Sequence, residues 1–372
     1  MLGGWGRKAA VGLIGAFLSL ALSPAAAREI GPRLTVYTAP AVAALFDALV
    51  APFAELTNRK YGVPVQVQVV TTSVPAAWTA LKTEWPNPRG DVYMLYGENI
   101  REGIGKGYFE PLRPHYDDAE WRRFDAGALE AMATQGYAAP FIMTAIVLAV
   151  QGSVPEDAVT AWADLEGETL RRRFTFESAL SVGSGYNVAA AAALAEGADW
   201  RAWFKADGFD EEAARPTLER MRRWADNALT LTQGSGTIRP LLARGDALAA
   251  TWWWANAVQE IRNGMDLRIV YPREGTVTAV QAGPVVMSVA KNPVAAIEWV
   301  KFVHSDRAAE IANGLNYLGR IPLAGEKPAA EWEAFVASAR QVPIDDFRAA
   351  AFDPHYRKAF MDAYRRIVIE GR

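Results

Sequence analysis

The sequence predicts an α/β protein built from open, mainly parallel sheets that are flanked by helices. The first observation is the repeated order of a buried strand, a polar turn and an amphipathic helix, which is typical of such sheets. The second is the length of 372 residues, half of them apolar, which is enough for roughly two domains with large cores. The third is the absence of cysteine, so stability must come from apolar packing and not from disulfides.

Charge and composition exclude several classes of function. With 39 Lys and Arg against 42 Asp and Glu, the chain lacks the basic excess of a nucleic-acid-binding protein. Without cysteine it has no thiol nucleophile, iron–sulfur cluster or Cys-based zinc site. His115, His304 and His355 do not have the spacing of metal ligands. We therefore expect no cofactor, no metal site and no enzymatic activity.

The first 27 residues have the order of a secretory signal peptide. Arg7 and Lys8 precede an apolar run from Ala9 to Leu22, and small residues end the segment at Ala27. The run is short for a membrane span, so we expect cleavage after Ala27, with a retained anchor as the alternative. The mature protein would then be soluble and periplasmic.

The first half of the mature chain alternates strands and helices. Residues 34–37 are an apolar run and residues 65–70 alternate Val with Gln, so both are expected to be strands, each followed by a helix. Residues 91–95 form a third short strand. The uncharged apolar run 141–150 has the length of a long buried strand.

A second α/β unit begins after this run. Residues 162–173 are charged and are expected to be helical, 174–176 form a strand, and a small-residue loop at 181–186 opens an Ala-rich helix over 187–195. The remaining expected strands are 247–251, 267–271 and 285–289, and the remaining expected helices are 237–244, 254–264, 292–303, 331–340 and 355–369.

Several short segments occur in an order that is similar to a known family. These segments are Leu34–Pro40, Asn87–Tyr93, Gly107–Leu112, Ser184–Tyr186, Arg244–Asp246, Lys291–Ala296 and His304–Asp306. In this order the chain resembles the periplasmic solute-binding proteins of ABC importers, specifically the extracellular solute-binding family that includes ferric-iron, polyamine, thiamine and aminoalkylphosphonate binders. The segments span nearly the whole mature chain.

The resemblance implies a two-lobed periplasmic-binding-protein fold, type II-like, with a ligand cleft between the lobes. Residues 28–140 and 285–372 would form the first lobe and residues 141–284 the second. A solute would close the lobes, and the closed protein, a monomer, would meet an ABC permease and its ATPase at the inner membrane. A chemosensory receptor would use the same cleft.

Polar turns at strand ends are the first candidate site. Ligands in open α/β sheets bind at the carboxyl ends of strands, near helix N-termini. Thr38 ends the first strand, and Thr71, Thr72 and Ser73 follow the second, so their hydroxyl and N–H groups could hold phosphate, phosphonate, sulfonate or carboxylate oxygens. The alternative for Thr71 to Ser73 is an ordinary helix cap.

The turn Ser184-Gly185-Tyr186 is the second candidate. Gly185 allows the backbone to approach a ligand, Tyr186 could stack on it, and the resemblance places this turn in the cleft. The alternative is a tight connection between a strand and a helix. Ser184 misses the Gly-x-Ser-x-Gly spacing of a hydrolase nucleophile, so a secreted hydrolase is the weaker hypothesis.

Aromatic residues supply the remaining candidates. In Trp252-Trp253-Trp254 the side chains of a strand must alternate between faces, so the three cannot all enter one core. We expect Trp253 or Trp254 to contact the solute, because they are nearest the carboxyl end, and the alternative is that the group packs between the sheet and the helices. Tyr96 ends another strand, and Tyr317 lies near Arg320, which could pair with an anion.

The expected solute is a small anionic or zwitterionic compound, such as a phosphonate. Neighbouring tyrosines bind iron in the ferric members of the family, but the nearest pair here is Tyr93 and Tyr96. A polyamine needs spaced carboxylates, for which Glu98, Asp226 and Asp246 are available. A polyamine-like or thiamine-like cation and ferric iron remain the alternatives.

Overall fold

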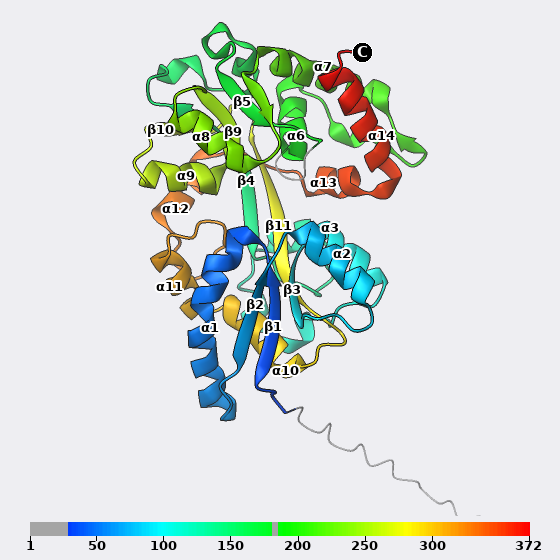
Figure 1. Ribbon diagram of the computed structural model, residues 1–372, viewed down its shortest axis with the longest axis vertical. Helices are drawn as coiled ribbons and strands as arrows, with labels where there is room; N and C mark the ends of the chain where they lie inside the picture. Colours follow the sequence, from blue (N-terminus) through cyan, green and yellow to red (C-terminus); the bar gives the residue numbers. More distant parts are fainter. Residues whose placement is uncertain (1–28, 181–184) are drawn as a thin grey trace, which may run out of the picture.

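Two lobes joined by two long strands make up the protein (Figure 1). The computed structural model describes residues 29–180 and 185–372, so the predicted signal peptide and Ser184 lie outside the described residues. Strands β4 (Ile142–Gln151) and β11 (Thr276–Val286) pair antiparallel and run through both lobes. The predicted two-lobed α/β fold is confirmed.

The first lobe begins with three parallel strands, in which β1 lies between β2 and β3. Its elements are β1 (Arg33–Thr38), α1 (Pro40–Tyr61), β2 (Gln66–Thr71), α2 (Val74–Glu84), β3 (Val92–Tyr96), α3 (Gly97–Gly105), α4 (Asp118–Trp121), α5 (Ala126–Met132), α10 (Pro293–Val303) and α11 (Asp306–Gly314). Apolar residues at helical and alternating spacing form these elements, so the sequence-based strands and helices of this lobe are observed.

The second lobe contains a further parallel set, in which β5 lies between β8 and β9. Its elements are β5 (Phe174–Glu177), α6 (Gly185–Glu196), β6 (Phe204–Lys205), β7 (Gly208–Phe209), α7 (Glu211–Asn227), β8 (Thr230–Thr232), α8 (Ile238–Ala243), β9 (Ala249–Trp253), α9 (Trp254–Arg262) and β10 (Leu267–Val270). The chain then closes with α12 (Ala330–Ser338), β12 (Gln341–Pro343), α13 (Asp345–Phe352), α14 (Pro354–Tyr364) and a π-helical turn, Arg365–Ile369.

One continuous sheet connects the two lobes. The strand order is β2-β1-β3-β11-β4-β9-β5-β8, with β10 at the side of β4 and β12 at the side of β11. Ile146, at the middle of β4, pairs with Trp253 of β9 on one side and with Val277 of β11 on the other. The two lobes are therefore joined by backbone hydrogen bonds as well as by the chain itself.

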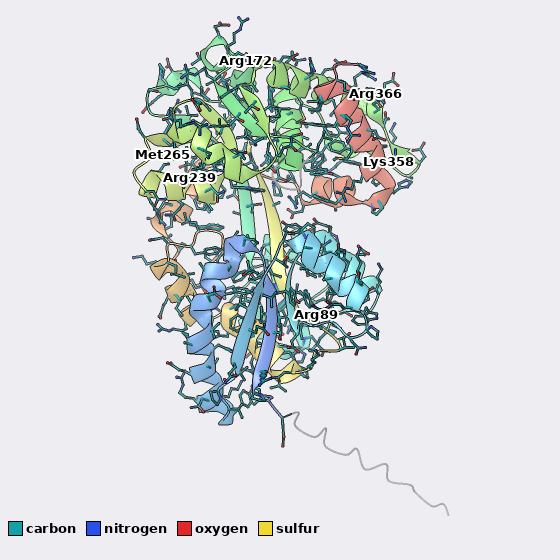
Figure 2. All side chains as sticks on the ribbon, in the orientation of Figure 1. Arg89, Arg172, Arg239, Met265, Lys358 and Arg366 are labelled. Atoms are coloured by element: carbon teal, nitrogen blue, oxygen red, sulfur yellow. The ribbon has the colours of Figure 1, made fainter. Side chains whose placement is uncertain are left out.

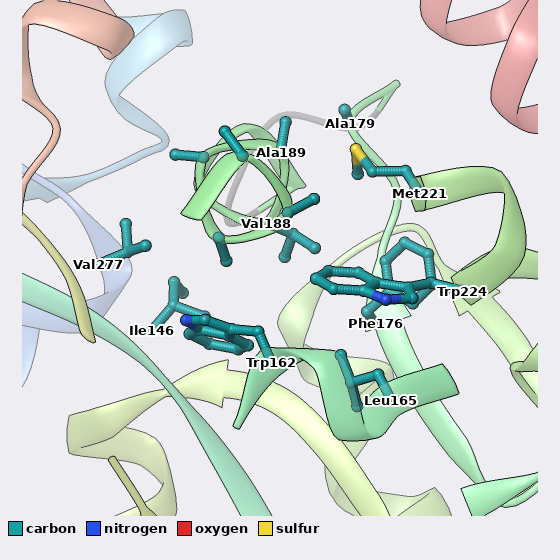
Figure 3. Packing of buried hydrophobic residues seen from close by; sticks show 14 of the residues in the cluster. Ile146, Trp162, Leu165, Phe176, Ala179, Val188, Ala189, Met221, Trp224 and Val277 are labelled. Carbon is teal, nitrogen blue, oxygen red and sulfur yellow. The ribbon is translucent and has the colours of Figure 1, made fainter. Parts of the chain in front are cut away.

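The largest apolar core lies in the second lobe. Val188 and Ala189 of α6 face Trp162, Trp224 and Phe176 there, and the two crossing strands contribute Ile146 and Val277 to the same cluster (Figure 3). The Ala-rich helix has small side chains all round, which lets it pack deep between the sheet and α7.

The C-terminal helices correct the expected division of the chain. All of residues 285–372 were expected in the first lobe, but α13 and α14 pack on the second lobe. Phe347 of α13 lies edge-to-face on Trp203 at 5.9 Å, and Phe360 of α14 belongs to the same core. The apolar faces of these helices are buried mainly in the second-lobe core, although α13 also contacts α3 and α5, so the chain returns to the second lobe after α11.

Residues 162–173 also differ from the sequence-based prediction of a helix. They form two 3-10 turns, Trp162–Glu166 and Glu168–Leu170, separated by Gly167 in an extended conformation. The side chain of Asp164 accepts hydrogen bonds from the backbone of Thr160 and Ala161, which caps the start of the first turn, and the extended Gly167 then interrupts the segment.

One helix in the described part of the chain, α1, is long and apolar enough to cross a membrane. Its apolar face, which includes Phe46 and Phe53, is buried against the first-lobe sheet and against Trp299 of α10. The apolar content of α1 is therefore explained by core packing.

Candidate functional site

The carboxyl ends of both parallel strand sets face the space between the lobes (Figure 1). These ends are Thr38, Thr71 and Tyr96 in the first lobe and Glu177, Thr232 and Trp253 in the second. The strand register supports this arrangement, since Tyr96 pairs with Ala282 of β11 and Trp253 pairs with Ile146 of β4. Strand ends and helix N-termini of both lobes thus converge on the crossing strands, as expected for a ligand site in open α/β sheets.

A cleft of about 1010 Å³ lies between α2 and α3 of the first lobe and α13 and α14 of the second. Its apolar lining includes Trp78, Tyr96 and Phe352. Its charged lining is mixed, with Lys82, Arg101 and Arg357 against Glu98, Glu102, Asp346 and Asp353. This volume and lining suit a small polar organic molecule better than a macromolecule.

Polar groups of both lobes meet beside this cleft, in a cluster that we name the interlobe junction, of which Glu98, Asn99 and Arg101 line the cleft. It consists of Glu98, Asn99 and Arg101 on α3, Asn187 on α6, and Asp345 and Arg348 on α13. Helix α13 packs against α3, α6 and β11, which brings these side chains together.

Arg348 is the central residue of the interlobe junction and is 4 % exposed. Its Nη1 donates to Oδ1 of Asn187 at 3.0 Å, and its Nη2 lies 3.6 Å from a carboxylate oxygen of Glu98. The guanidinium also lies over the rings of Tyr96 and Phe352, with distances of 5.6 and 5.4 Å to the ring centroids. A single cation of the second lobe is therefore held against an acidic and an aromatic residue from the first.

Asp345 links the interlobe junction to the crossing strands. Its Oδ1 accepts a hydrogen bond of 3.0 Å from the backbone N–H of Val280 in β11. Burial raises the pKa of Asp345 to about 6, although the charges of Arg348 and Arg101 act in the opposite direction. The Arg101 side chain donates to the carbonyl oxygen of Met132 at 2.8 Å, and burial lowers its pKa.

Part of the predicted turn after β2 has a structural role. Ser73 is the N-cap of α2, and its hydroxyl accepts a hydrogen bond of 3.3 Å from the N–H of Ala76. Thr71 is exposed and Thr72 half-buried beside it. Thr38 is 2 % exposed, and its hydroxyl has no hydrogen-bond partner among the described residues. Their contact with a solute stays a prediction.

Gly185 and Tyr186 serve the packing of α6. A Cβ on Gly185 would lie 2.2 Å from the carbonyl oxygen of Ser178, so the helix start approaches the end of β5 very closely. Tyr186 is 1 % exposed, and its ring packs against those of Phe352 and Phe360. The buried tyrosine leaves no free ring face for a solute to stack on.

The three consecutive tryptophans divide between core and strand end. Trp252 and Trp254 are each 3 % exposed. Trp254 donates its indole N–H to the hydroxyl of Tyr271 at 3.3 Å and packs against Phe335 of α12, so it is a core residue. Trp253 is half-buried at the carboxyl end of β9 and is not part of the cleft lining described above, so its contact with a solute stays a prediction.

Tyr317 and Arg320 lie apart from the cleft. Tyr317 is half-buried and lines a separate small pocket with Trp332. Arg320 is paired with Glu326 through two hydrogen bonds of 2.5 and 2.8 Å, so its charge is already compensated. The expectation that Arg320 could pair with an anionic solute is corrected by this ion pair.

The two tyrosines nearest in sequence point to different environments. Tyr93 is fully buried, stacks on Tyr37 at 4.6 Å and accepts a hydrogen bond from the N–H of Gly90. Tyr96 lies at the cleft, beside Arg348. Among the described residues, no group of three or more His, Cys, Asp or Glu side chains could hold a metal ion.

Sequence reasoning missed Arg348, Asn187 and Asp345. Asn187 directly follows the predicted turn at Tyr186, but nothing in the local pattern distinguishes it from other helix-starting asparagines. Arg348 and Asp345 were missed because no helix was expected over residues 345–352, and that segment was assigned to the first lobe. Tyr96 and Glu98 were singled out, and both line the cleft.

Charged side chains such as Arg172, Lys358 and Arg366 lie on the outer surface of the second lobe (Figure 2). Lys358 and Arg366 pair with neighbouring acids, Asp362 and Glu211. These pairs are far more solvated than the polar groups of the interlobe junction, so we expect them to contribute to solubility more than to binding.

Comparison with known proteins gives a family match and a shared fold. A family model described as bacterial extracellular solute-binding protein matches residues 48–339. The fold is similar to that of PotD, a spermidine/putrescine ABC transporter substrate-binding protein from Streptococcus pneumoniae, with a TM-score of 0.70, 14% identity, and coverage of 92% of this chain and 100% of that chain.

Two further solved structures have the same architecture. One is an ABC transporter protein from Clostridium perfringens, with a TM-score of 0.68, 17% identity, and coverage of 90% of this chain and 99% of that chain. The other is the periplasmic binding protein AfuA from Actinobacillus pleuropneumoniae, solved with fructose-6-phosphate, with a TM-score of 0.67, 16% identity, and coverage of 91% and 98%. No curated protein sequence matches the chain.

Proposed function

The chain belongs to the bacterial extracellular solute-binding protein family, and we propose that it captures a small anionic or zwitterionic organic solute for an ABC importer. The observation that carries this proposal is the cleft of about 1010 Å³, whose walls come from both lobes and carry charges of both signs. A molecule that contacts both walls at once favours the closed arrangement of the lobes.

Closure follows from differential binding. The protein samples open and closed forms, and a solute that contacts α3 and α13 together binds the closed form more tightly. The continuous sheet confines the motion to the crossing strands, where a register irregularity interrupts the β4–β11 pairing between Val280 and Ala282. The closed lobes then present a surface to the permease and ATPase in the inner membrane.

The positive charges in and beside the cleft support an anionic group on the solute. Arg101, Arg348 and Arg357 are guanidinium groups, which bind carboxylate and phosphonate oxygens through paired hydrogen bonds. The acidic residues of the same cleft favour a cationic group on the solute. A polyamine-like or thiamine-like cation, or ferric iron, is the alternative solute of the same family.

We propose a binding role without catalysis. His115 lies near Glu110 on the first lobe, His304 is buried in the first-lobe core, and His355 is exposed at the start of α14. Each therefore has a position outside the cleft lining, and a general base for hydrolysis would have to come from the carboxylates. The secreted-hydrolase hypothesis has no support from this arrangement.

Native mass spectrometry of the exported protein tests the proposal. We expect a small organic molecule to remain bound after purification, and its addition to the unfolded and refolded protein to raise the melting temperature. Small-angle scattering should show a smaller radius of gyration with the molecule bound. Identical dimensions with and without a tightly bound solute would contradict closure, and binding of ferric ion alone would contradict the solute class.

A further inference from the structure

The interlobe junction contains buried hydrogen-bond acceptors that the protein does not satisfy. Oε1 of Glu98, Oδ1 of Asn99 and Oδ2 of Asp345 are buried atoms with no hydrogen-bond partner among the described residues. Nδ2 of Asn187, which is fully buried, is a donor of the junction that also has no partner among the described residues. Leaving a buried polar atom unsatisfied costs about 1–3 kcal/mol, so these three acceptors require an explanation.

The neighbouring cations do not supply the missing hydrogen bonds. Nη1 of Arg348 donates to Asn187, and its Nη2 is 3.6 Å from Glu98, which is beyond hydrogen-bond distance. The rings of Tyr96 and Phe352 hold the guanidinium in this position. Arg101 donates Nη1 to the carbonyl oxygen of Met132. The junction is therefore rich in acceptors although two guanidinium groups lie beside it.

A solute in the cleft can reach two of these side chains. Glu98 and Asn99 both line the cleft, and the side chain of Glu98 is 16 % exposed. An alkylammonium group carries three N–H donors and a positive charge, which matches a carboxylate and an amide oxygen. An anion beside these two oxygens would meet acceptors and the negative charge of Glu98, and would be repelled.

We infer that the interlobe junction is an ammonium-binding subsite, with Glu98 and Asn99 as acceptors, and that the solute is a small zwitterion. The inference rests on the proposed function and narrows its solute class. Arg348 and Nδ2 of Asn187 are the adjacent donors, and they suit the oxyanion of the same molecule. Glu98 and Arg348 come from different lobes, so one zwitterion bound by both would hold the lobes together.

A competing explanation is that Glu98 and Arg348 form an ion pair between the lobes and do not contact the solute. A small further closure would bring Glu98 into hydrogen-bond contact with Arg348, and the pair would then only hold the lobes together. The two explanations differ in one measurable property. A subsite gives selectivity for an amino group on the solute, whereas an ion pair between the lobes changes the affinity for every solute equally.

Calorimetric titration of the full-length mature protein separates them. The probes are 2-aminoethylphosphonate with its partners ethylphosphonate and ethylamine, and β-alanine with propionate and propylamine. We expect wild-type protein to bind at least one zwitterion tenfold or more tightly than its deaminated partner. The substitution Glu98→Gln should reduce this ratio to about twofold or less, because it removes the carboxylate charge that favours an ammonium group.

Glu310→Gln is the matched control, since Glu310 on α11 is 66 % exposed, pairs with Arg307 and lies outside the cleft lining. It should keep the wild-type ratio, and an unchanged unfolding transition shows that both variants fold. Two results overturn the subsite but not the proposed function. One is equal affinity of the zwitterions and their deaminated partners, and the other is a Glu98→Gln variant that keeps the wild-type ratio of these two affinities. Absence of binding by all six probes counts against the proposed solute class itself.

Discussion

The guanidinium of Arg320 and the carboxylate of Glu326 form a bidentate pair in which neither side chain is more than 6 % exposed. Glu326 also accepts a hydrogen bond from the N–H of Leu323, so the pair fixes the loop between α11 and α12. This is a structural ion pair of the first lobe, at a distance from the cleft lining.

Arg320→Ala should destabilise the protein by about 3–5 kcal/mol, because it leaves a buried carboxylate without its counter-charge. Urea unfolding at pH 7 measures the change. Arg307→Ala is the control, since Arg307 and Glu310 form an exposed pair, and it should cost about 0.5 kcal/mol or less. A loss of solute affinity in a stable Arg320→Ala protein would instead restore the sequence-based expectation of an anion contact.

Substitutions of Trp253, at the end of β9, and of Trp254, at the start of α9, should affect binding and stability separately. Trp254→Ala removes a core side chain and should cost about 3–5 kcal/mol of unfolding free energy. Trp253→Ala removes a half-buried ring at the strand end and should cost less stability but lower the affinity for the co-purified solute about tenfold, or ~1.4 kcal/mol. Unfolding and titration of both variants test this, and unchanged affinity in Trp253→Ala would remove that residue from the site.

Acid should destabilise the protein through His304. This imidazole is buried between Phe124 and Phe141, donates to the carbonyl oxygen of Val300 at 2.8 Å, and has its pKa lowered to about 3 by burial. Between the unfolded value of about 6.5 and the folded value, only the unfolded chain binds the proton. The stability from neutral His304 is therefore complete above about pH 6.5 and is lost as the pH falls toward 3.

Unfolding free energies at pH 4, 5, 6 and 7 measure this dependence. His304→Phe keeps the aromatic packing without the titrating group, and its stability should fall less between pH 7 and pH 4 than that of the wild type. His355→Asn, at an exposed position, should keep the wild-type slope. Parallel curves for wild type and His304→Phe would show that other groups cause the acid sensitivity.

Gly185→Ala should destabilise the second lobe. The new methyl group would lie 2.2 Å from a backbone carbonyl oxygen, so α6 or β5 must shift, at a cost of about 1–3 kcal/mol. Gly234→Ala is the control because an added Cβ there has no atom within 4 Å, and its effect should be within about 0.5 kcal/mol. Equal effects in thermal unfolding would mean that the close approach at Gly185 is relaxed without cost.

Local patterns predicted most of the fold because most of its strands and helices have a regular spacing of apolar residues. The alternation in residues 65–70 and the apolar run 141–150 correspond to β2 and β4. The helix expected over residues 162–173 is not observed because the extended Gly167 divides the segment into two short 3-10 turns. Helix α7 carries many charges and was passed over, although its Met221 and Trp224 are fully buried.

The site was less predictable because it depends on which lobe each helix joins. No local pattern shows that α13 crosses back to the second lobe, and the interlobe junction exists only through that docking. Tyr96 and Glu98 could be singled out from a strand end, a local feature. Trp254 and Tyr186 look exposed or reactive as isolated residues, but α12 and α14 cover them, and these helices lie far away in sequence.

The ring of Trp299 in α10 fits edge-to-face against Phe46 and Phe53 of α1, across about two-thirds of the chain. The first-lobe core therefore stays incomplete until almost the whole polypeptide has been synthesised, because local segments cannot bury these rings by themselves. For a chain that is exported, as we propose, this late completion of the core would keep the nascent protein unfolded while it passes through a translocation pore. The final folding step then takes place on the far side of the membrane, where α10 and α1 can first meet.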